Sequence, residues 1–481
     1  MELMSSVLKS EIVKLNAAPQ QAIVHTWELT VHTPTEDIKA LYLHWVKQYS
    51  NYTTHFADEL MAACSFPAGT YDHVIYQQRD DLQVTLKKVY LENNSTVSVA
   101  APQKEEEVLR YRCKLFDTRS SRIEQNQPIA QERDRLDASQ TRDVKLQLIH
   151  PLIDFLRKTS TGGVFHRCRG IDAVRAFLGK ETRKAAAECN VPFLGVDVAS
   201  GFNQELCDNI MVPDHTPMEE IPQFINDDVG GIYPTGFWYY LQDKHWFLYP
   251  KMDLQRYYSH TGLRLKVINV PDRKLPDAPK TFYIEDNLLT VLATGETRQI
   301  DLAEMEQENK GNGTRFLNPN KLFNDYVKRD KNKAISNSAN VVSEVSVEPR
   351  RDGTNYTTLS DTPITSRFNN EYSKLASRNG MLVQFVWESA LPDYIYPGMP
   401  ASFVYLKNEV EVEELTGVVC SMEWQSTPLQ TDTQNRQFQR KAAIQLFVGR
   451  GIDPTKVQPG STGQGSVGLG SPANTGATAG G

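Results

Sequence analysis

Several kinds of residue and motif are scarce in this chain of 481 residues, beginning with cysteine. There is no C-x-x-C pair, and long gaps separate the cysteines, which argues against a zinc module and against a disulfide framework. We interpret the six cysteines as buried free thiols of a protein made in the cytoplasm: Cys64, Cys113, Cys168, Cys189, Cys207 and Cys420.

Long apolar runs are also missing. No stretch approaches the roughly 20 apolar residues that span a bilayer. The amino terminus carries no cationic segment followed by an apolar run, so it does not resemble a signal peptide. The sequence therefore predicts a protein without stable membrane anchoring that is made and folded in the cytoplasm.

An excess of basic charge is absent as well. The net charge is −7 and the pI about 5.9, with Lys and Arg interspersed among Asp and Glu. Proteins that wrap nucleic acid usually carry a basic face, so we expect no nucleic-acid specificity. The apolar fraction of 40% and charged fraction of 23% are ordinary for a globular protein, and the length suggests about three domains.

Motifs of catalysis are missing too. The sequence contains no G-x-S-x-G elbow, no phosphate loop and no H-E-x-x-H. A literal G-x-G-x-x-G at Gly463, Gly465 and Gly468 lies in a Gly-rich tail without the flanking strand and helix that a dinucleotide site needs. The sequence predicts no catalytic residue, no cofactor and no metal site, and hence a protein that is not an enzyme.

Some smaller groups resemble sites without completing one. His166 and Cys168 could face one side of a strand, but a nucleophilic thiol needs a base held beside it, and a partly buried turn is the alternative interpretation. Asp214-His215 and His245 have no further ligands at metal-site spacing. The neighbouring Asp227 and Asp228 are not placed to flank a scissile glycosidic bond.

A dense aromatic cluster suggests either a stacking surface for bases or sugars, or a hydrophobic core or subunit interface, and composition favours the latter. Its members are Phe237, Trp238, Tyr239, Tyr240, Trp246, Phe247 and Tyr249. They lie in a predicted strand hairpin over Phe237 to Tyr249, with Gln242-Asp243-Lys244 as its turn.

Residues 1–150 predict a small antiparallel β-barrel or sandwich. Leu82, Val84 and Leu86 alternate with polar residues, and the same period-two pattern recurs over 109–115 and 144–148. Glu36 to Tyr49 has helical spacing, with Thr35 as its N-cap, and predicts a helical insertion.

Residues 151–258 predict a mixed α/β middle domain, with helices over Pro151 to Lys158 and Ile171 to Cys189. Residues 259–450 return to alternating strands, with a polar insertion at about 304–361. The Gly/Ser/Thr-rich segment 451–481 contains almost no charge and predicts a flexible tail. The fold class is therefore α+β, mostly β, with two small antiparallel barrels.

Three phrases carry a family resemblance: Val212-Pro213-Asp214-His215-Thr216 with Glu220 to Ile225, Trp246 to Pro250, and Tyr396-Pro397-Gly398-Met399-Pro400 followed by Thr416-Gly417-Val418-Val419. In layout and in these phrases the chain resembles the central hub protein of contractile bacteriophage baseplates, whose plan type VI secretion spike proteins share. The chain departs from the family in its amino-terminal insertion and in carrying Trp424 where the family's last phrase usually has His.

The resemblance implies a structural virion protein that forms a homotrimer and joins a trimeric spike to a six-fold tail tube. Its expected partners are itself, the spike protein, the tube protein and other baseplate proteins, and its expected location is the tail baseplate. Another virion structural protein, such as a wedge, neck or decoration protein, is the alternative, and a tail-associated cell-wall hydrolase is a third reading. Gly398 and Gly417 are expected at strand entry points of the second barrel, where Gly417→Val should weaken assembly before folding.

Overall fold

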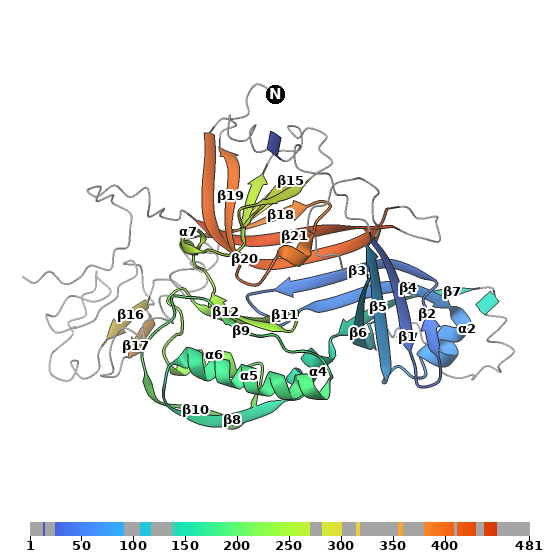
Figure 1. Ribbon diagram of the computed structural model, residues 1–481, viewed down its shortest axis with the longest axis horizontal. Coiled ribbons are helices and arrows are strands. Elements are labelled where there is room, and N and C mark those ends of the chain that lie inside the picture. The colour runs from blue at the N-terminus through green and yellow to red at the C-terminus, as the bar shows by residue number, and fades with distance from the viewer. Residues whose placement is uncertain are drawn as a thin grey trace, which may run out of the picture.

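The computed structural model describes residues 13–14, 25–90, 106–116, 137–138, 140–269, 281–300, 314–317, 355–358, 380–407, 411–429 and 437–449. Within these ranges the protein is mostly β, with a few helices gathered in the middle of the chain (Figure 1). The predicted α+β, mostly β class is confirmed at this level. No helix in the described part of the chain is long and apolar enough to cross a membrane.

The amino-terminal strands, together with two strands from the carboxyl-terminal region, pair in a closed antiparallel circuit, the first circuit. Its order is β1, β5, β6, β7, β4, β3, β20 and β21, and β21 returns to β1 through His25 and Phe438. The bounds are β1 His25–His32, β3 Tyr42–Asn51, β4 Glu59–Pro67, β5 Leu82–Tyr90, β6 Glu106–Leu115, β7 Thr141–Ile149, β20 Glu411–Pro428 and β21 Phe438–Gly449; the short β2 (Asp37–Lys39) pairs with β1.

A second circuit reuses β20 and β21. From them the pairing continues through β18 (Met381–Trp387), β15 (Leu288–Ile300), β13 (Arg264–Asn269) and β19 (Pro400–Lys407), and β19 returns to β20. β14 (Phe282–Glu285) is added outside β15. Figure 1 shows the long β20 and β21 between the strands of the two circuits. The two groups of strands are therefore joined by a shared pair rather than by a linker.

The middle of the chain contains the helices. α5 (Gly170–Glu188) and α6 (Ile221–Asp228) lie between a ribbon of β8 (Ser160–Cys168) and β10 (Cys207–Pro217) and a sheet of β9 (Gly195–Val198), β12 (His245–Pro250) and β11 (Phe237–Gln242) (Figure 1). α4 (Pro151–Lys158) precedes this unit and α7 (Arg256–Ser259) follows it. The helices predicted over Pro151 to Lys158 and Ile171 to Cys189 are confirmed as α4 and α5. The predicted hairpin is also confirmed, and its turn residues Asp243 and Lys244 have φ of 48° and 67°.

Two hydrophobic cores organise these parts. One core runs through both strand circuits, and the other fills the helical middle around α5. The β11–β12 hairpin contributes to both, because alternate residues of a strand point to opposite faces: Tyr240 and Tyr249 enter the first core, and Tyr239 and Trp246 the second.

The helix predicted over Glu36 to Tyr49 is wrong. The segment forms β2 and β3, and β3 pairs with β4 on one side and β20 on the other. The register of β3 on β4 shifts between Leu43 and Trp45. A bulge adds one residue to a strand, so the core-facing Leu43 and Val46 stand three apart, as they would in a helix.

Two further expectations about the second circuit need correction. Its strands are not all antiparallel, because β13 pairs in parallel with both β15 and β19. Gly417 is not at a strand entry but inside β20, opposite Ala401 of β19 and Val448 of β21. Within the predicted polar insertion at 304–361 the structure describes only the parallel pair β16 (Thr314–Leu317) and β17 (Asn355–Thr358), and the predicted tail at 451–481 lies outside the described residues.

Candidate functional site

The segment between β18 and β19 touches all the major parts of the molecule, and we call residues 390–399 the junction segment. It contains a short 3-10 helix, η4 (Pro392–Tyr394), followed by the Tyr396-Pro397-Gly398 phrase. Ile395 and Met399 are fully buried. A connection that is buried in this way fixes the position of its neighbours, which makes it a candidate for a structural centre of the molecule.

The junction segment is bonded to the middle region at several points. The Ile395 carbonyl oxygen accepts a hydrogen bond from Gln242 Nε2 at 3.0 Å, and the Gly398 carbonyl oxygen accepts one from Arg256 Nη1 at 2.9 Å. The Tyr396 ring stacks on Phe247 with centroids 6.0 Å apart. These contacts tie the turn before β19 to the helical middle of the chain.

Gly398 shows why the phrase needs glycine at this position. Its φ is +65°, in the left-handed region, and a Cβ here would lie 2.3 Å from Tyr249 Cδ2. Tyr249 is buried and belongs to the β11–β12 hairpin, so the turn and the middle region pack in direct contact. Any side chain at this position would combine backbone strain with a collision.

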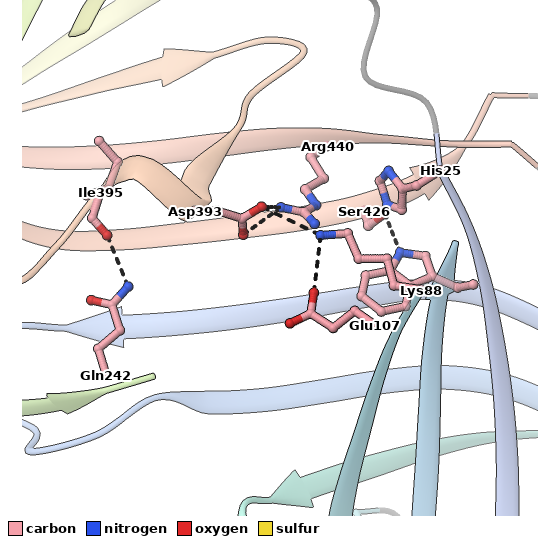
Figure 2. A network of polar contacts seen from close by, with 9 residues as sticks. His25, Lys88, Glu107, Gln242, Asp393, Ile395, Ser426 and Arg440 are labelled. Atoms are coloured by element: carbon pink, nitrogen blue, oxygen red, sulfur yellow. Dashed lines mark hydrogen bonds and ion pairs between the residues drawn. The ribbon is translucent and has the colours of Figure 1, made fainter. Parts of the chain in front are cut away.

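The junction segment also reaches into the interior of the first circuit through Asp393. Arg440 Nη1 of β21 donates to both carboxylate oxygens of Asp393, at 3.0 and 2.9 Å. Lys88 Nζ of β5 lies 3.6 Å from Asp393 Oδ2 and 4.0 Å from Glu107 Oε2 of β6. Figure 2 shows the two cations converging on the Asp393 carboxylate. We call Lys88, Glu107, Asp393 and Arg440 the interior charge cluster.

Both cations of this cluster occupy core-facing strand positions. Lys88 continues the buried series of Leu82, Val84 and Leu86 along β5, and only 2% of its surface is exposed. Arg440 lies between the buried Phe438 and Ala442 on β21 and is 4% exposed. Burying such charges is costly unless carboxylates compensate them, so Asp393 and Glu107 are required where they are.

Aromatic rings complete the surroundings of the cations. The Arg440 guanidinium lies 5.0 Å from the Trp424 ring centroid, and Lys88 Nζ lies 5.7 Å from that of Trp27. Trp27 Nε1 donates to Ser426 Oγ at 3.0 Å. His25 Nε2 lies 2.9 Å from the same oxygen (Figure 2). These bonds link β1 to β20 at the end of the circuit where β1 meets β21.

Two groups in the structure contain serine and histidine and invite comparison with hydrolase sites. Ser426 and His25 are fully buried in the core, and Ser426 Oγ also accepts from Trp27, so no substrate carbonyl could approach it. In the second group, Ser65 Oγ and Asp143 Oδ1 both approach the same His44 nitrogen, Nε2, at 2.6 and 3.4 Å. A catalytic triad needs the acid on the other ring nitrogen, so neither group has triad geometry.

One carboxylate is held in an unusual state where the first circuit meets the middle region. Asp58 Oδ1 accepts hydrogen bonds from Ser50 Oγ at 2.5 Å and from Tyr240 OH at 2.8 Å. Burial raises the pKa of Asp58 to about 6, against the opposing effect of these two donors. The pKa of this carboxyl group, which lies beside the Tyr52–Tyr240 pair, is therefore raised into the mildly acidic range.

The small groups considered from the sequence are placed apart. His166 Nδ1 lies 2.6 Å from Asn209 Oδ1, while Cys168 lies at the end of β8, after Arg167 with φ of 47°. His245 pairs with Asp197 at 2.9 Å, whereas Asp214 and His215 are exposed on β10. Among the described residues no group of three or more His, Cys, Asp or Glu could hold a metal ion.

The acidic pair Asp227 and Asp228 lies at a helix end, and the aromatic cluster mainly packs in the cores. Asp227 and Asp228 end α6, where Asp227 accepts from Gln223 Nε2 at 2.9 Å. Most of the aromatic cluster is buried in the two cores, while Trp238 donates to the His55 carbonyl oxygen and Phe247 packs on Tyr396. The preference for a core over a stacking surface is confirmed for the buried rings.

Comparison with known proteins adds the following. No family model matches the chain, and no curated protein matches it. The solved structures that it resembles are phage tail and baseplate proteins and type VI secretion proteins. A tail protein from Neisseria meningitidis MC58 has a TM-score of 0.45 at 9% identity, over 88% of this chain and 96% of that one.

Two other structures belong to the same group. A 43 kDa tail protein of prophage MuSo2 from Shewanella oneidensis has a TM-score of 0.40 at 8% identity, over 88% of this chain and 99% of that one. An Escherichia coli component of the type VI secretion system, described as similar to T4 tail proteins gp27 and gp5, has a TM-score of 0.38 at 6% identity, over 88% and 79% of the two chains.

The interior charge cluster was missed in the sequence, although a signal for half of it was present. The alternation that places Leu82, Val84 and Leu86 on one face also places Lys88 there, and a core-facing lysine requires a carboxylate partner. The alternation over Ala442 to Val448 extends back to Arg440 in the same way. The partner Asp393 could not be found, because it reaches the cluster from a connection far away in the sequence.

Proposed function

We propose that this chain is the central hub of a phage tail baseplate, a structural protein that joins a trimeric spike to a six-fold tail tube. The observation that carries the proposal is the double closure of strand pairing within one chain, where the two circuits share β20 and β21. Each circuit would form a small tube-like barrel, the first mainly from residues 1–150 and the second from about 259–450, on either side of a middle domain at 151–258.

The different symmetries of the spike and the tube explain why one chain would carry two barrels. A spike with three-fold symmetry must meet a tube with six-fold symmetry. Three copies of a chain with two barrels offer six barrel positions, and differences between the two barrels absorb the three-fold side. Homo-oligomers close by cyclic symmetry, so the expected state is a homotrimer, assembled on the spike.

Closed pairing suits such a part in a second way. An open sheet presents unpaired N–H and C=O groups that recruit other strands, and closure removes these edges. A protein packed at high local concentration in a tail would gain from having few such edges. The expected partners are the spike protein, the tube protein and other baseplate proteins, in a virion that is assembled in the host cytoplasm.

The interior charge cluster and the junction segment fit a role in holding the parts of the hub together. They join β5, β6, β21, η4 and, through Gln242 and Arg256, the middle region. Such cross-links would transmit force between the proposed barrels and the middle domain without a change in their relative positions. The proposal therefore assigns these residues a structural role and assigns no catalytic residue.

Copy number and symmetry test the proposal. Native mass spectrometry of the purified chain with its spike should give three copies, and quantitative mass spectrometry of whole particles should give three copies per tail. Cryo-electron microscopy of the tail should then show a ring of six similar barrels. Six or more copies per tail, or a position at the neck, wedge or capsid, would instead support another virion structural role.

A separate assay addresses the hydrolase reading. Purified chain incubated with peptidoglycan should release no soluble fragments. Release that a single substitution at Ser65 or Asp143 abolishes would overturn the non-catalytic assignment, because these residues and His44 form the second serine–histidine group described above.

A further inference from the structure

Two cysteines face each other across the β8–β10 ribbon. Cys168 ends β8, Cys207 begins β10, and the strand register pairs them directly. Directly opposed residues of antiparallel strands have Cα atoms about 4.5–5.5 Å apart. That separation falls within the range of about 4.4–6.8 Å found between the Cα atoms of disulfides.

The surroundings of this pair differ from those of the three buried thiols. Cys64, Cys113 and Cys420 are buried in the strand circuits, and burial raises the pKa of Cys113 and of Cys420 to about 12. Cys168 and Cys207 are only partly buried, so a thiol reagent can reach them. Burial raises the pKa of Cys207, and the neighbouring Cys168 adds to that rise, which is consistent with two sulfurs close together.

The end of the ribbon also leaves room for the bond to form. Arg167, immediately before Cys168, has φ of 47°, so the strand backbone is distorted next to its last residue. The Cβ atoms of a disulfide lie closer together than those of an average cross-strand pair, which requires a small rotation of one residue. A strand end can make that rotation more easily than a strand centre.

We propose that Cys168 and Cys207 are a disulfide site that is reduced in the cytoplasm and closes when the protein meets a small-molecule disulfide oxidant. One thiolate attacks the oxidant disulfide, forming a mixed disulfide and releasing one thiol. The second cysteine thiolate then attacks the mixed disulfide, forming the Cys168–Cys207 bond and releasing the second thiol. Two protein thiols are oxidised, and one oxidant disulfide is reduced to two thiols.

The consequence is a covalent lock on the middle region. The bond closes a loop of roughly 40 residues, and closing such a loop restricts the unfolded chain. This loop contains α5 and β9, which pack in the second core. The lock would therefore stabilise the middle region once the protein leaves a reducing environment, and it does not depend on the function proposed above.

The test uses the full chain, reduced and then transferred to oxidised glutathione. After free thiols are blocked with N-ethylmaleimide, non-reducing peptide mapping should find a cross-linked pair of peptides containing Cys168 and Cys207. The thermal midpoint of the middle region should rise by a few degrees and return to its starting value with dithiothreitol.

Three variants sharpen the result. Cys168→Ser and Cys207→Ser should each abolish the cross-link and the shift. Cys189→Ser should retain both, because Cys189 is also partly buried but lies at the end of α5 and has no cross-strand cysteine. Blocking of both Cys168 and Cys207 as separate glutathione or maleimide adducts in the wild-type chain, or a cross-link to Cys189, would overturn the proposal.

Discussion

Arg440 Nη1 donates to both oxygens of the Asp393 carboxylate, at 3.0 and 2.9 Å, although 47 residues separate the two in sequence. The arginine side chain is 4% exposed and the aspartate side chain 53% exposed. The cation is therefore inside the first circuit, while the anion enters from its end. Because Lys88 approaches the same carboxylate, one side chain from the junction segment contacts two buried positive charges, and Glu107 beside Lys88 supplies the second negative charge.

Replacement of Asp393 should therefore be costly. Asp393→Asn leaves Lys88 and Arg440 with less compensation, and we expect unfolding free energy to fall by about 2–4 kcal/mol, towards the lower end because Asp393 is half exposed. Urea denaturation measures this loss. Glu388→Gln is the matched control, because Glu388 pairs with Lys441 at 2.5 Å on the surface and should cost less than about 1 kcal/mol. Equal losses in the two variants would contradict the assignment.

Because the pKa of Asp58 is raised in the folded state, we expect mild acidification to raise the stability of the protein. The folded pKa of about 6 lies above the usual value of 3.8, so the folded state binds the proton more tightly than the unfolded state. The destabilisation is absent below about pH 4 and develops as pH rises through 6. Asp58→Asn should keep both acceptor contacts and raise stability at pH 7 by on the order of 1–3 kcal/mol.

The measurement is urea denaturation between pH 4 and 7.5. Asp228→Asn, at the exposed end of α6, is the control and should leave the pH dependence unchanged. A wild-type curve with the same slope as Asp58→Asn in this range would show that Asp58 does not titrate as described.

The titration of His150 should give stability the opposite dependence on pH, so that acidification lowers it. His150 caps α4 by accepting from the Leu152 amide at 3.2 Å, and burial, helped by Lys244, lowers its pKa to about 4. The neutral ring stabilises the fold fully above the ordinary pKa of 6.5, and this contribution is lost as pH falls towards 4. His150→Asn retains a capping acceptor but does not titrate, so its acid loss should be smaller by on the order of 1–3 kcal/mol. His215→Asn, on exposed β10, should behave like wild type when thermal midpoints are compared from pH 7 to pH 4.

Gly417 should be essential for folding rather than for assembly alone. A Cβ at Gly417 would lie 1.8 Å from the Phe447 carbonyl oxygen in the adjacent strand. Because the obstacle is backbone, Gly417→Ala must displace β21 from β20, and we expect a loss of at least about 3 kcal/mol. Gly179→Ala in α5, whose Cβ would meet only Arg183 at 4.0 Å, should be neutral or stabilising. A Gly417→Ala chain that unfolds cooperatively at the wild-type thermal midpoint would refute this.

The sequence by itself determined where most elements lie. Period-two alternation located strands such as β5 and β7, because a half-buried strand must place apolar residues on one face, and this is a local property. Helical spacing located α5 for the same reason. Reading the spacing of apolar residues gave a wrong result at β3, because a bulge near Leu43 converts strand spacing into helix-like spacing. A bulge forms only against a partner strand, so the local sequence does not show it.

Tertiary structure alone decided which strands pair and which charges meet. The use of β20 and β21 in both circuits, the parallel pairing of β13 and the approach of Asp393 to Lys88 and Arg440 join residues that are distant in sequence. No local pattern encodes such contacts, since each depends on how much apolar surface and how many buried charges the whole arrangement satisfies. The sequence therefore determined the elements and the inward-facing cations, and the packed fold decided their partners.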